Sequence, residues 1–240
     1  MNMAEADNKL KGIRGKVVVS CQPVVAGPMD STAIVISLGL AAEAGGASGL
    51  RIESIASVRS LRKLTTLPII GIVKRSLPDS KVIITPLLKD VEGLAEAGAD
   101  IIAYDATQRP RPVPTHRIVE RIHECGALAM ADCARIEDGR QALAEGAHIL
   151  GTTLSGYAYL EAPENSPPDL NLIQEFAKMD IFVIAEGRIR TTIEAAEAIS
   201  HGADAVVVGS AITRVEHITS WFSDAIAEAF ESPVNIVKSL

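Results

Sequence analysis

Eight short apolar segments, each followed by a stretch with helical periodicity, recur along the chain. They are rich in Val, Ile and Ala and cover residues 17–19, 47–50, 69–74, 101–104, 127–131, 149–151, 181–185 and 205–208. Apolar runs of this length, bounded by Gly, Pro or polar loops, are typical of buried parallel strands. Eight strand–helix units predict an α/β fold of the (β/α)8 TIM-barrel class, because helices must cover the outer face of a parallel sheet.

An open, doubly wound sheet is the structural alternative. It would usually show a glycine-rich loop after the first strand, and residues 21–23 do not supply one. Three predicted helix-to-strand joints share a glycine followed by alanine, at Gly98, Gly146 and Gly202. Glycine suits the position just after a helix, so these joints support regular alternation of helix and strand.

The size and composition of the chain fit one barrel. Of its 240 residues 48% are hydrophobic but only 3% are aromatic, so the core must consist of Ala, Val, Ile and Leu. We expect a single catalytic barrel domain over residues 16–240. Residues 1–15 form an N-terminal arm that is either frayed or a short helix covering one end of the domain. An apolar stripe over residues 218–229 predicts a last helix, which covers the barrel or builds a homodimer.

The charge and the cysteines limit the partners and the compartment. A net charge of −7 without a block of Lys and Arg argues against nucleic acid, although an acidic protein can still hold a small anion. The three cysteines, Cys21, Cys125 and Cys133, show no metal-ligand spacing, which favours reduced thiols in a cytoplasm. Residues 1–15 carry no signal-peptide pattern, and no apolar run approaches the length of a membrane span.

Polar and charged residues stand at the end of almost every predicted strand. They are Gln22, Arg51, Lys74, Asp105, Asp132, Thr152, Glu186 and Ser210. In a barrel the carboxyl ends of all strands surround one mouth, where chemistry is located. The alternative is that these residues simply mark where each strand reaches water. The repeated occurrence of charge at the end of a buried strand favours a catalytic mouth.

The last two strand ends predict a phosphate site. Gly187 and Arg188 follow the seventh strand, and Gly209, Ser210 and Arg214 follow the eighth. Barrels often hold a phosphate on backbone N–H groups of these two loops and of a short helix. Glycine lets the backbone approach the phosphate oxygens, and an arginine can add a charged hydrogen bond.

Lys74 and Glu186 are the candidate proton carriers. They end strands three and seven, which lie across a barrel from each other. Two groups on opposite faces of one carbon next to a carbonyl would invert its configuration. Lysine acts as a base only if burial or nearby cations, here Arg75 and Arg51, lower its pKa. The alternative is an ion pair between Lys74 and Glu186 that closes the mouth.

No metal site is predicted, because the histidines fall mostly on helices or at strand starts. They are His116, His123, His148, His201 and His217.

The ordered motifs resemble one family, the N-acylmannosamine-6-phosphate 2-epimerases. The resemblance runs from about residue 16 to residue 228. Its motifs are VSCQ at 19–22, IGIVKR at 70–75, ITP at 84–86, DATQRPRP at 105–112, MAD at 130–132, GTTLSGY at 151–157, VIAEGR at 183–188 and VGSAITR at 208–214. Gln108 and residues 133–135 depart from the family pattern, and the latter bear on which N-acyl group is accepted.

The resemblance implies conversion of N-acetylmannosamine 6-phosphate to N-acetylglucosamine 6-phosphate without a cofactor, in amino-sugar and sialic acid breakdown. It implies proton transfer at C2 by Lys74 and Glu186, and phosphate binding by the glycine loops. The implied contacts to the sugar and its N-acetyl group are Gln22, Arg51 and Asp132, and Thr152 at the end of the sixth strand is a further candidate for substrate binding. Two alternatives remain: another cofactor-free sugar-phosphate isomerase, and a sugar-phosphate sensor without catalysis.

Overall fold

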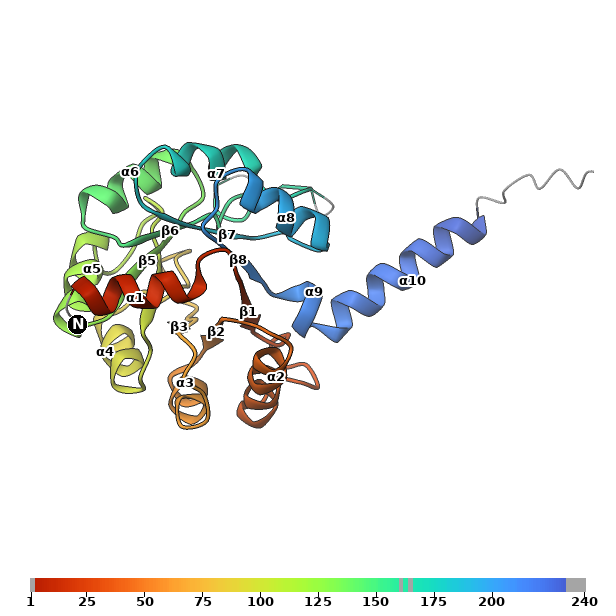
Figure 1. Ribbon diagram of the computed structural model, residues 1–240, viewed down its shortest axis with the longest axis horizontal. Coiled ribbons are helices and arrows are strands. Elements are labelled where there is room, and N and C mark those ends of the chain that lie inside the picture. Colours follow the sequence, from red (N-terminus) through yellow and green to blue (C-terminus); the bar gives the residue numbers. More distant parts are fainter. Residues whose placement is uncertain (1–2, 160–161, 164–165, 232–240) are drawn as a thin grey trace, which may run out of the picture.

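Eight parallel strands close into a barrel in the computed structural model, which describes residues 3–159, 162–163 and 166–231 (Figure 1). The strands are β1 Val17–Cys21, β2 Gly49–Glu53, β3 Ile69–Ile72, β4 Ile101–Asp105, β5 Leu128–Asp132, β6 Ile149–Gly151, β7 Phe182–Glu186 and β8 Ala205–Val208. Each strand pairs with its neighbours in the sequence, and β1 also pairs with β8, with Val17 opposite Val206. The (β/α)8 prediction is therefore confirmed, and the open sheet is excluded.

Seven helices surround the barrel and cover the outer face of its sheet (Figure 1). They are α2 Thr32–Ala44, α3 Ile55–Arg62, α4 Leu88–Glu96, α5 Thr115–Glu124, α6 Ile136–Ala144, α7 Leu170–Ala177 and α8 Thr192–Ser200. The predicted glycine joints are confirmed: Gly98, Gly146 and Gly202 have φ angles of 95°, 93° and 103°. Residues with a side chain rarely adopt this conformation, so glycine is what lets each chain segment turn from helix to strand.

The side chains form two apolar layers. The outer layer lies between the sheet and the helices and includes Leu50, Ile102 and Phe176. The inner layer fills the barrel and includes Leu128 and Ile184, both fully buried. Because successive residues of a strand point to opposite faces, one apolar strand supplies both layers. The barrel is therefore a packed core whose open end lies at its rim.

The N-terminal arm forms a helix, α1 Met3–Ile13, that crosses one end of the barrel (Figure 1). Ile13 is fully buried in the inner layer, and Leu10 packs against that layer. Arg14, which follows the helix, pairs with Asp204 at the start of β8. The short-helix alternative for the arm is therefore the correct one, and this helix closes the amino end of the barrel.

Several strand boundaries differ from the predictions, and two of these differences change how a site residue is held. The second strand was expected to end in Arg51, but β2 runs to Glu53 and places Arg51 inside the sheet, opposite Ser20 and Ile70. The third strand ends at Ile72, and Lys74 forms an isolated antiparallel bridge with Ile84. The segment around Ile84 thus supports the backbone of Lys74.

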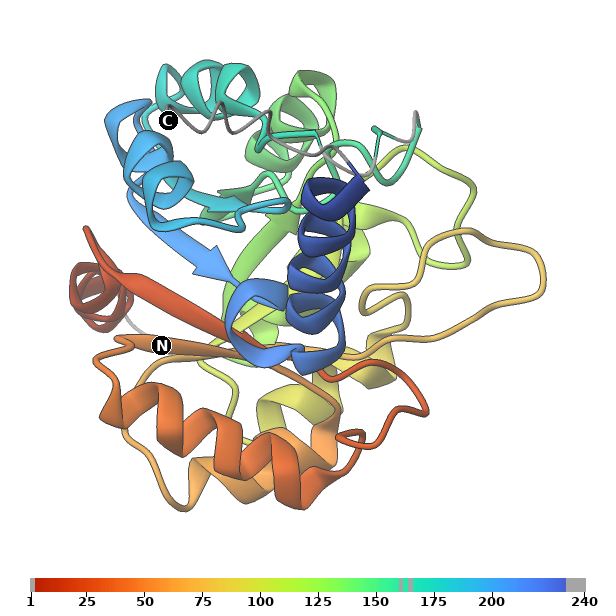
Figure 2. The same cartoon turned by 90° about the vertical axis from the view of Figure 1, so that its right-hand side faces the viewer.

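The last helix does not cover the barrel. A one-turn helix, α9 Ser210–Thr213, is followed by α10 Val215–Glu231, which projects away from the barrel (Figures 1 and 2). No residue of α10 is buried, and Phe222, Ile226 and Phe230 are 68%, 67% and 87% exposed. Within the described residues no helix is long and apolar enough to cross a membrane.

Candidate active site

A cavity of about 510 Å³ opens at the carboxyl ends of the strands. Nine of the site residues predicted from the sequence line it, namely Gln22, Arg51, Lys74, Glu186, Gly187, Arg188, Gly209, Ser210 and Arg214. They lie in β2, β7 and α9 and in the segments that follow β1, β3, β7, β8 and α9, which the closed barrel brings to one rim. Three residues predicted for the mouth, Asp105, Asp132 and Thr152, do not line the cavity and are 0%, 0% and 3% exposed.

Arg51 holds two carboxylates together beneath the cavity. It is 1% exposed and binds Asp132 through two hydrogen bonds, from Nη1 to Oδ1 at 3.1 Å and from Nη2 to Oδ2 at 2.7 Å. Its Nη1 also lies 2.9 Å from Glu186 Oε2. A buried cation is stable only when it is paired in this way, so Asp132 is what allows Arg51 to occupy the interior of a strand. Asp132 thus orients the guanidinium at the floor of the cavity.

Glu186 holds a proton more tightly than an ordinary glutamate. Burial raises its pKa from 4.5 to about 7; nearby Asp132 acts in the same direction, and Arg51 opposes the shift. Its backbone is fixed by Thr152, whose hydroxyl donates to the Glu186 carbonyl at 2.9 Å and accepts from the Glu186 N–H at 3.1 Å. A carboxyl group that titrates near neutral pH can both give and take a proton.

Lys74 shows the opposite shift. Burial lowers its pKa, and the positive charges of Arg214 and Arg51 lower it further. The side chain is exposed to the cavity, but the surrounding walls remove part of its hydration. Partial loss of hydration disfavours the charged form of a lysine. The predicted contribution of Arg75 is wrong, because Arg75 pairs with Asp90 at 2.6 Å instead.

The alternative of an ion pair between Lys74 and Glu186 is not what the described residues form. Glu186 pairs with Arg51, and the carboxylate nearest the Lys74 backbone is Glu53, whose Oε1 accepts from the Lys74 N–H at 3.4 Å. Lys74 and Glu186 therefore remain available to a ligand between them. Their pKa values are shifted towards each other, which lowers the cost of moving a proton between the two groups.

The predicted phosphate end of the cavity is tied to the first strand. Gly209 begins helix α9, and the Thr213 hydroxyl donates to the Ser20 carbonyl at 2.7 Å. Arg214 Nε donates to the Gln22 carbonyl at 2.8 Å. These bonds fix the loop after β8 against β1. The second glycine, Gly187, has a φ angle of 106° and brings the backbone after β7 to the same rim.

Arg188 is engaged by the loop that follows β6. Its Nε donates to the Pro167 carbonyl at 2.8 Å, and its Nη1 donates to the Ser155 carbonyl. The guanidinium also lies 5.8 Å from the centre of the Tyr157 ring. Although Arg188 lines the cavity, its side chain thus holds this loop in place.

Comparison with known proteins identifies the family of the chain. A model of the family described as "Putative N-acetylmannosamine-6-phosphate epimerase" matches residues 35–228. The chain belongs to this epimerase family. The Escherichia coli O157:H7 protein described as "Putative N-acetylmannosamine-6-phosphate 2-epimerase" is 51% identical over 227 residues, which are 95% of this chain and 98% of that protein.

Two further relatives of this epimerase-family chain are a longer, bifunctional enzyme and a protein of known structure. The Brucella melitensis biotype 1 "Bifunctional enzyme NanE/NanK" is 53% identical over 224 residues, but these are 92% of this chain and only 43% of that enzyme. The chain therefore spans less than half the length of the bifunctional relative. The solved N-acetylmannosamine-6-phosphate 2-epimerase from Clostridium perfringens superposes with a TM-score of 0.86 at 39% identity, over 90% of this chain and 95% of that one.

Several residues of this epimerase-family site were not predicted. Thr153, Tyr157, His217 and Trp221 also line the cavity. His217 and Trp221 are four residues apart on α10 and so share one helix face, which was the available signal. Thr153 stands next to the predicted Thr152, but only the structure shows which of the two hydroxyls faces the cavity.

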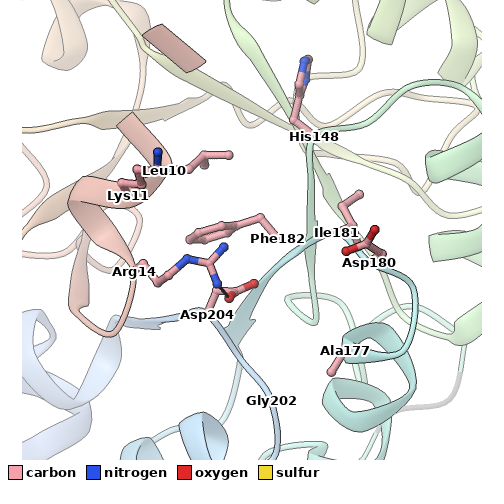
Figure 3. A pocket seen from close by; sticks show the side chains of 10 residues that line it. All are labelled: Leu10, Lys11, Arg14, His148, Ala177, Asp180, Ile181, Phe182, Gly202 and Asp204. Atoms are coloured by element: carbon pink, nitrogen blue, oxygen red, sulfur yellow. Dashed lines mark hydrogen bonds and ion pairs between the residues drawn. The ribbon is translucent and has the colours of Figure 1, made fainter. Parts of the chain in front are cut away.

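A second cavity, of about 500 Å³, lies at the amino end of the barrel between α1 and the starts of β6 to β8 (Figure 3). Arg14 reaches across it to pair with Asp204, and its guanidinium lies 5.0 Å from the centre of the Phe182 ring. His148 lies on the opposite wall, and burial lowers its pKa. We assign the chemistry to the other cavity, because TIM-barrel enzymes use the carboxyl ends of their strands.

Among the residues that the structure describes, no group of three or more His, Cys, Asp or Glu side chains is arranged to hold a metal ion.

Proposed function

We propose that this chain interconverts N-acetylmannosamine 6-phosphate and N-acetylglucosamine 6-phosphate by removing and returning the proton at C2. The observation that carries the proposal is the pair Lys74 and Glu186, which face one cavity with pKa values shifted towards each other. The names of the E. coli and C. perfringens relatives support this choice of substrate.

The proposed reaction breaks the C2–H bond next to the C1 carbonyl of the open-chain sugar. The base takes the proton, and the electron pair moves into the enolate, whose charge is on the C1 oxygen. A proton returned to the other face of C2 gives the other epimer. Each of the two groups removes the proton from the epimer whose C2–H faces it, so neutral Lys74 and ionised Glu186 serve opposite directions of the reaction. A substrate hydroxyl in place of one group is the alternative.

Binding of the rest of the substrate is divided between two walls. We assign the sugar and its N-acetyl group to Gln22 and Arg51, which line the cavity, with Asp132 and Thr152 acting from behind by orienting Arg51 and the backbone of Glu186. The phosphate belongs to Gly187, Gly209, Ser210 and Arg214, where backbone N–H groups and a guanidinium meet. Arg188 completes this wall by holding the loop after β6.

The test is NMR of purified protein with N-acetylmannosamine 6-phosphate in heavy water. The expected result is appearance of the gluco epimer with deuterium at C2. Lys74→Met and Glu186→Gln are each expected to slow epimerisation by about 10²-fold or more, while each still exchanges the C2 hydrogen of the one epimer that the remaining group faces. Lys63→Met, which removes an exposed lysine after α3, is the matched control. If Glu186→Gln still epimerises at the normal rate, a substrate hydroxyl takes its place.

The same measurement separates the sensor alternative. A sensor binds the sugar phosphate, seen by isothermal titration calorimetry, without epimerisation or C2 exchange. Binding of another sugar phosphate with turnover would instead identify a different cofactor-free isomerase. Activity that persists after dialysis against a chelator supports the absence of a required metal or cofactor.

We propose that the chain forms a homodimer through α10. The helix leaves Phe222, Ile226 and Phe230 exposed, and a second copy of the chain is the partner that would cover them. Light scattering is expected to give twice the mass of 25.3 kDa, and Phe222→Asp to give the monomer mass. A monomer mass for the unaltered protein would refute this proposal.

We further propose that the enzyme works in the cytoplasm, without nucleic acid or membrane as a partner. Its cysteines, Cys21, Cys125 and Cys133, are all free, and the chain carries a net charge of −7. Cell fractionation tests the compartment.

A further inference from the structure

The ends of β4 and β5 do not line the cavity, although all eight strands end around one rim. The last residue of each of these two strands is fully buried. Residues 152–159, which follow β6, form the wall on this side instead. Thr153 and Leu154 line the cavity, and the Leu154 N–H donates to the Cys133 carbonyl, directly after β5, at 3.0 Å. The position of this 152–159 segment therefore sets the width of the cavity on the side of β4 and β5.

Tyr159 anchors the 152–159 segment to the two neighbouring loops. Its hydroxyl accepts a hydrogen bond from the backbone N–H of Gln108, after β4, at 2.7 Å. The same hydroxyl donates to Asp138 Oδ1, in the first turn of α6, at 3.1 Å. The guanidinium carbon of Arg135, which precedes α6, lies 4.1 Å from the centre of the Tyr159 ring. One side chain therefore joins the segments that follow β4, β5 and β6.

The main partner of this hydroxyl is a buried carboxylate. Asp138 is 0% exposed, and its Oδ2 accepts from the Ala134 N–H at 3.1 Å. Burial raises the pKa of Asp138, and the hydrogen bonds from Ala134 and Tyr159 oppose this shift because they favour the charged form. A buried carboxylate that loses a donor is costly, so the bond from Tyr159 is retained for a physical reason.

Gln108 and residues 133–135 are the positions at which the sequence departs from the family pattern. None of them lines the cavity, and the contacts of Tyr159 bring both positions to one side chain. Gln108 takes part through its backbone N–H, whereas Arg135 takes part through its side chain. Any effect of these positions on the substrate is therefore indirect, through the 152–159 segment.

We propose that Tyr159 is a positioning residue, which holds the 152–159 segment across the ends of β4 and β5 and so keeps the cavity at the width that the sugar needs. Tyr159 itself does not line the cavity. Arg188 holds the same segment from the side of β7, through the Ser155 carbonyl, and Tyr159 is the corresponding anchor on the other side. The effect on the sugar rests on the proposed function, but the anchoring is a property of the protein without substrate.

The first test is amide hydrogen exchange at Gln108, measured by NMR on the protein without substrate. Tyr159→Phe removes the hydroxyl and keeps the ring that Arg135 contacts. We expect the Gln108 amide to exchange about tenfold faster, as the loss of one hydrogen bond would produce. Tyr104→Phe, which removes a hydroxyl from the buried outer layer of the barrel, is the matched control and is expected to leave this rate unchanged.

The second test measures KM and kcat for N-acetylmannosamine 6-phosphate. Tyr159→Phe is expected to raise KM by about 3- to 30-fold, because the wall of the cavity loses one or two hydrogen bonds that fix it. We expect kcat to stay within about threefold, because Glu186 keeps its contacts with Arg51 and Thr152. Tyr104→Phe is expected to change neither constant. If the protein binds the sugar phosphate without turnover, Kd from isothermal titration calorimetry takes the place of KM.

An unchanged exchange rate at Gln108 in Tyr159→Phe would overturn the anchor, whether or not the protein is an epimerase. Faster exchange with an unchanged KM, or a fall in kcat alone, would overturn the positioning role. If Tyr159→Phe does not fold, Arg135→Met replaces it, since this side chain is 47% exposed. Loss of its contact with the ring is expected to raise the exchange rate and KM by about 2- to 5-fold.

Discussion

Replacing Glu186 by glutamine is expected to change how the stability of the fold depends on pH. Burial in the barrel mouth raises the pKa of this carboxyl from 4.5 to about 7. A carboxyl group whose pKa is raised by folding binds its proton more tightly in the folded chain than in the unfolded one. Ionisation of Glu186 therefore lowers the free energy of unfolding as the pH rises from 4.5 to 7. Above pH 7 this loss of stability is complete.

The magnitude follows from the size of the shift. The rise of this pKa from 4.5 to about 7 corresponds to about 3 kcal/mol in full, since a tenfold change in proton affinity is worth about 1.36 kcal/mol. Between pH 5 and pH 8 the expected part is about 2–3 kcal/mol, because some of the difference has already developed at pH 5. Glutamine keeps the shape of the side chain but does not titrate. Relative to the unaltered protein, Glu186→Gln should therefore be more stable at pH 8 than at pH 5, with a free energy of unfolding that is higher by about 2–3 kcal/mol.

Urea unfolding followed by far-UV circular dichroism at both pH values measures this difference. The single tryptophan, Trp221, is a poor probe of the barrel, because α10 buries none of its residues. Glu120→Gln, whose side chain on α5 is 51% exposed, sets the baseline for removing one glutamate charge. A difference for Glu186→Gln that stays within about 0.5 kcal/mol of this baseline, with equal m-values, would refute the argument that folding desolvates this carboxyl.

Three further outcomes are expected. Lys74→Met should lower kcat for epimerisation by about 10²- to 10⁴-fold, measured by coupled assay or NMR, with the fold retained in circular dichroism. Arg214→Met removes a positive charge that lowers the pKa of Lys74, so the acid-side limb of the kcat/KM profile should move to higher pH while KM for the phosphorylated sugar rises. Gly151→Ala should lower the free energy of unfolding by about 1–3 kcal/mol in urea titrations, because its Cβ would lie 2.7 Å from Met130 Cε.

The alternation of strands and helices was predictable because it depends on local pattern. Apolar runs bounded by glycine and polar loops specify strands wherever they occur, and Gly98, Gly146 and Gly202 marked the joints correctly. The position of Arg51 inside β2 was not predictable, because a charged residue normally ends a buried run. Its carboxylate partner Asp132 lies 81 residues away, and only the closed barrel brings the two together.

The environment of Lys74 shows the same limit at the site. Sequence proximity suggested Arg75 as the cation that lowers the pKa of Lys74, but that side chain pairs with Asp90. The cations that act are Arg214, from the far end of the chain, and Arg51, which was predicted. Likewise, the apolar stripe of α10 predicted a packed helix, but periodicity alone does not tell which surface it packs on, and the barrel is not that surface.

Closure of the barrel between its first and last strands sets the order of events during synthesis. β1 is complete at Cys21, but its second neighbour, β8, ends at Val208. At synthesis rates of about 5–20 residues per second, roughly 10–40 s pass between completion of β1 and completion of β8, and the edge of β1 is unpaired with β8 during this time. During that interval the nascent chain presents two open sheet edges, which can pair with those of other chains. The yield of folded protein should therefore depend on translation speed and chaperones more than on the stability of the finished barrel.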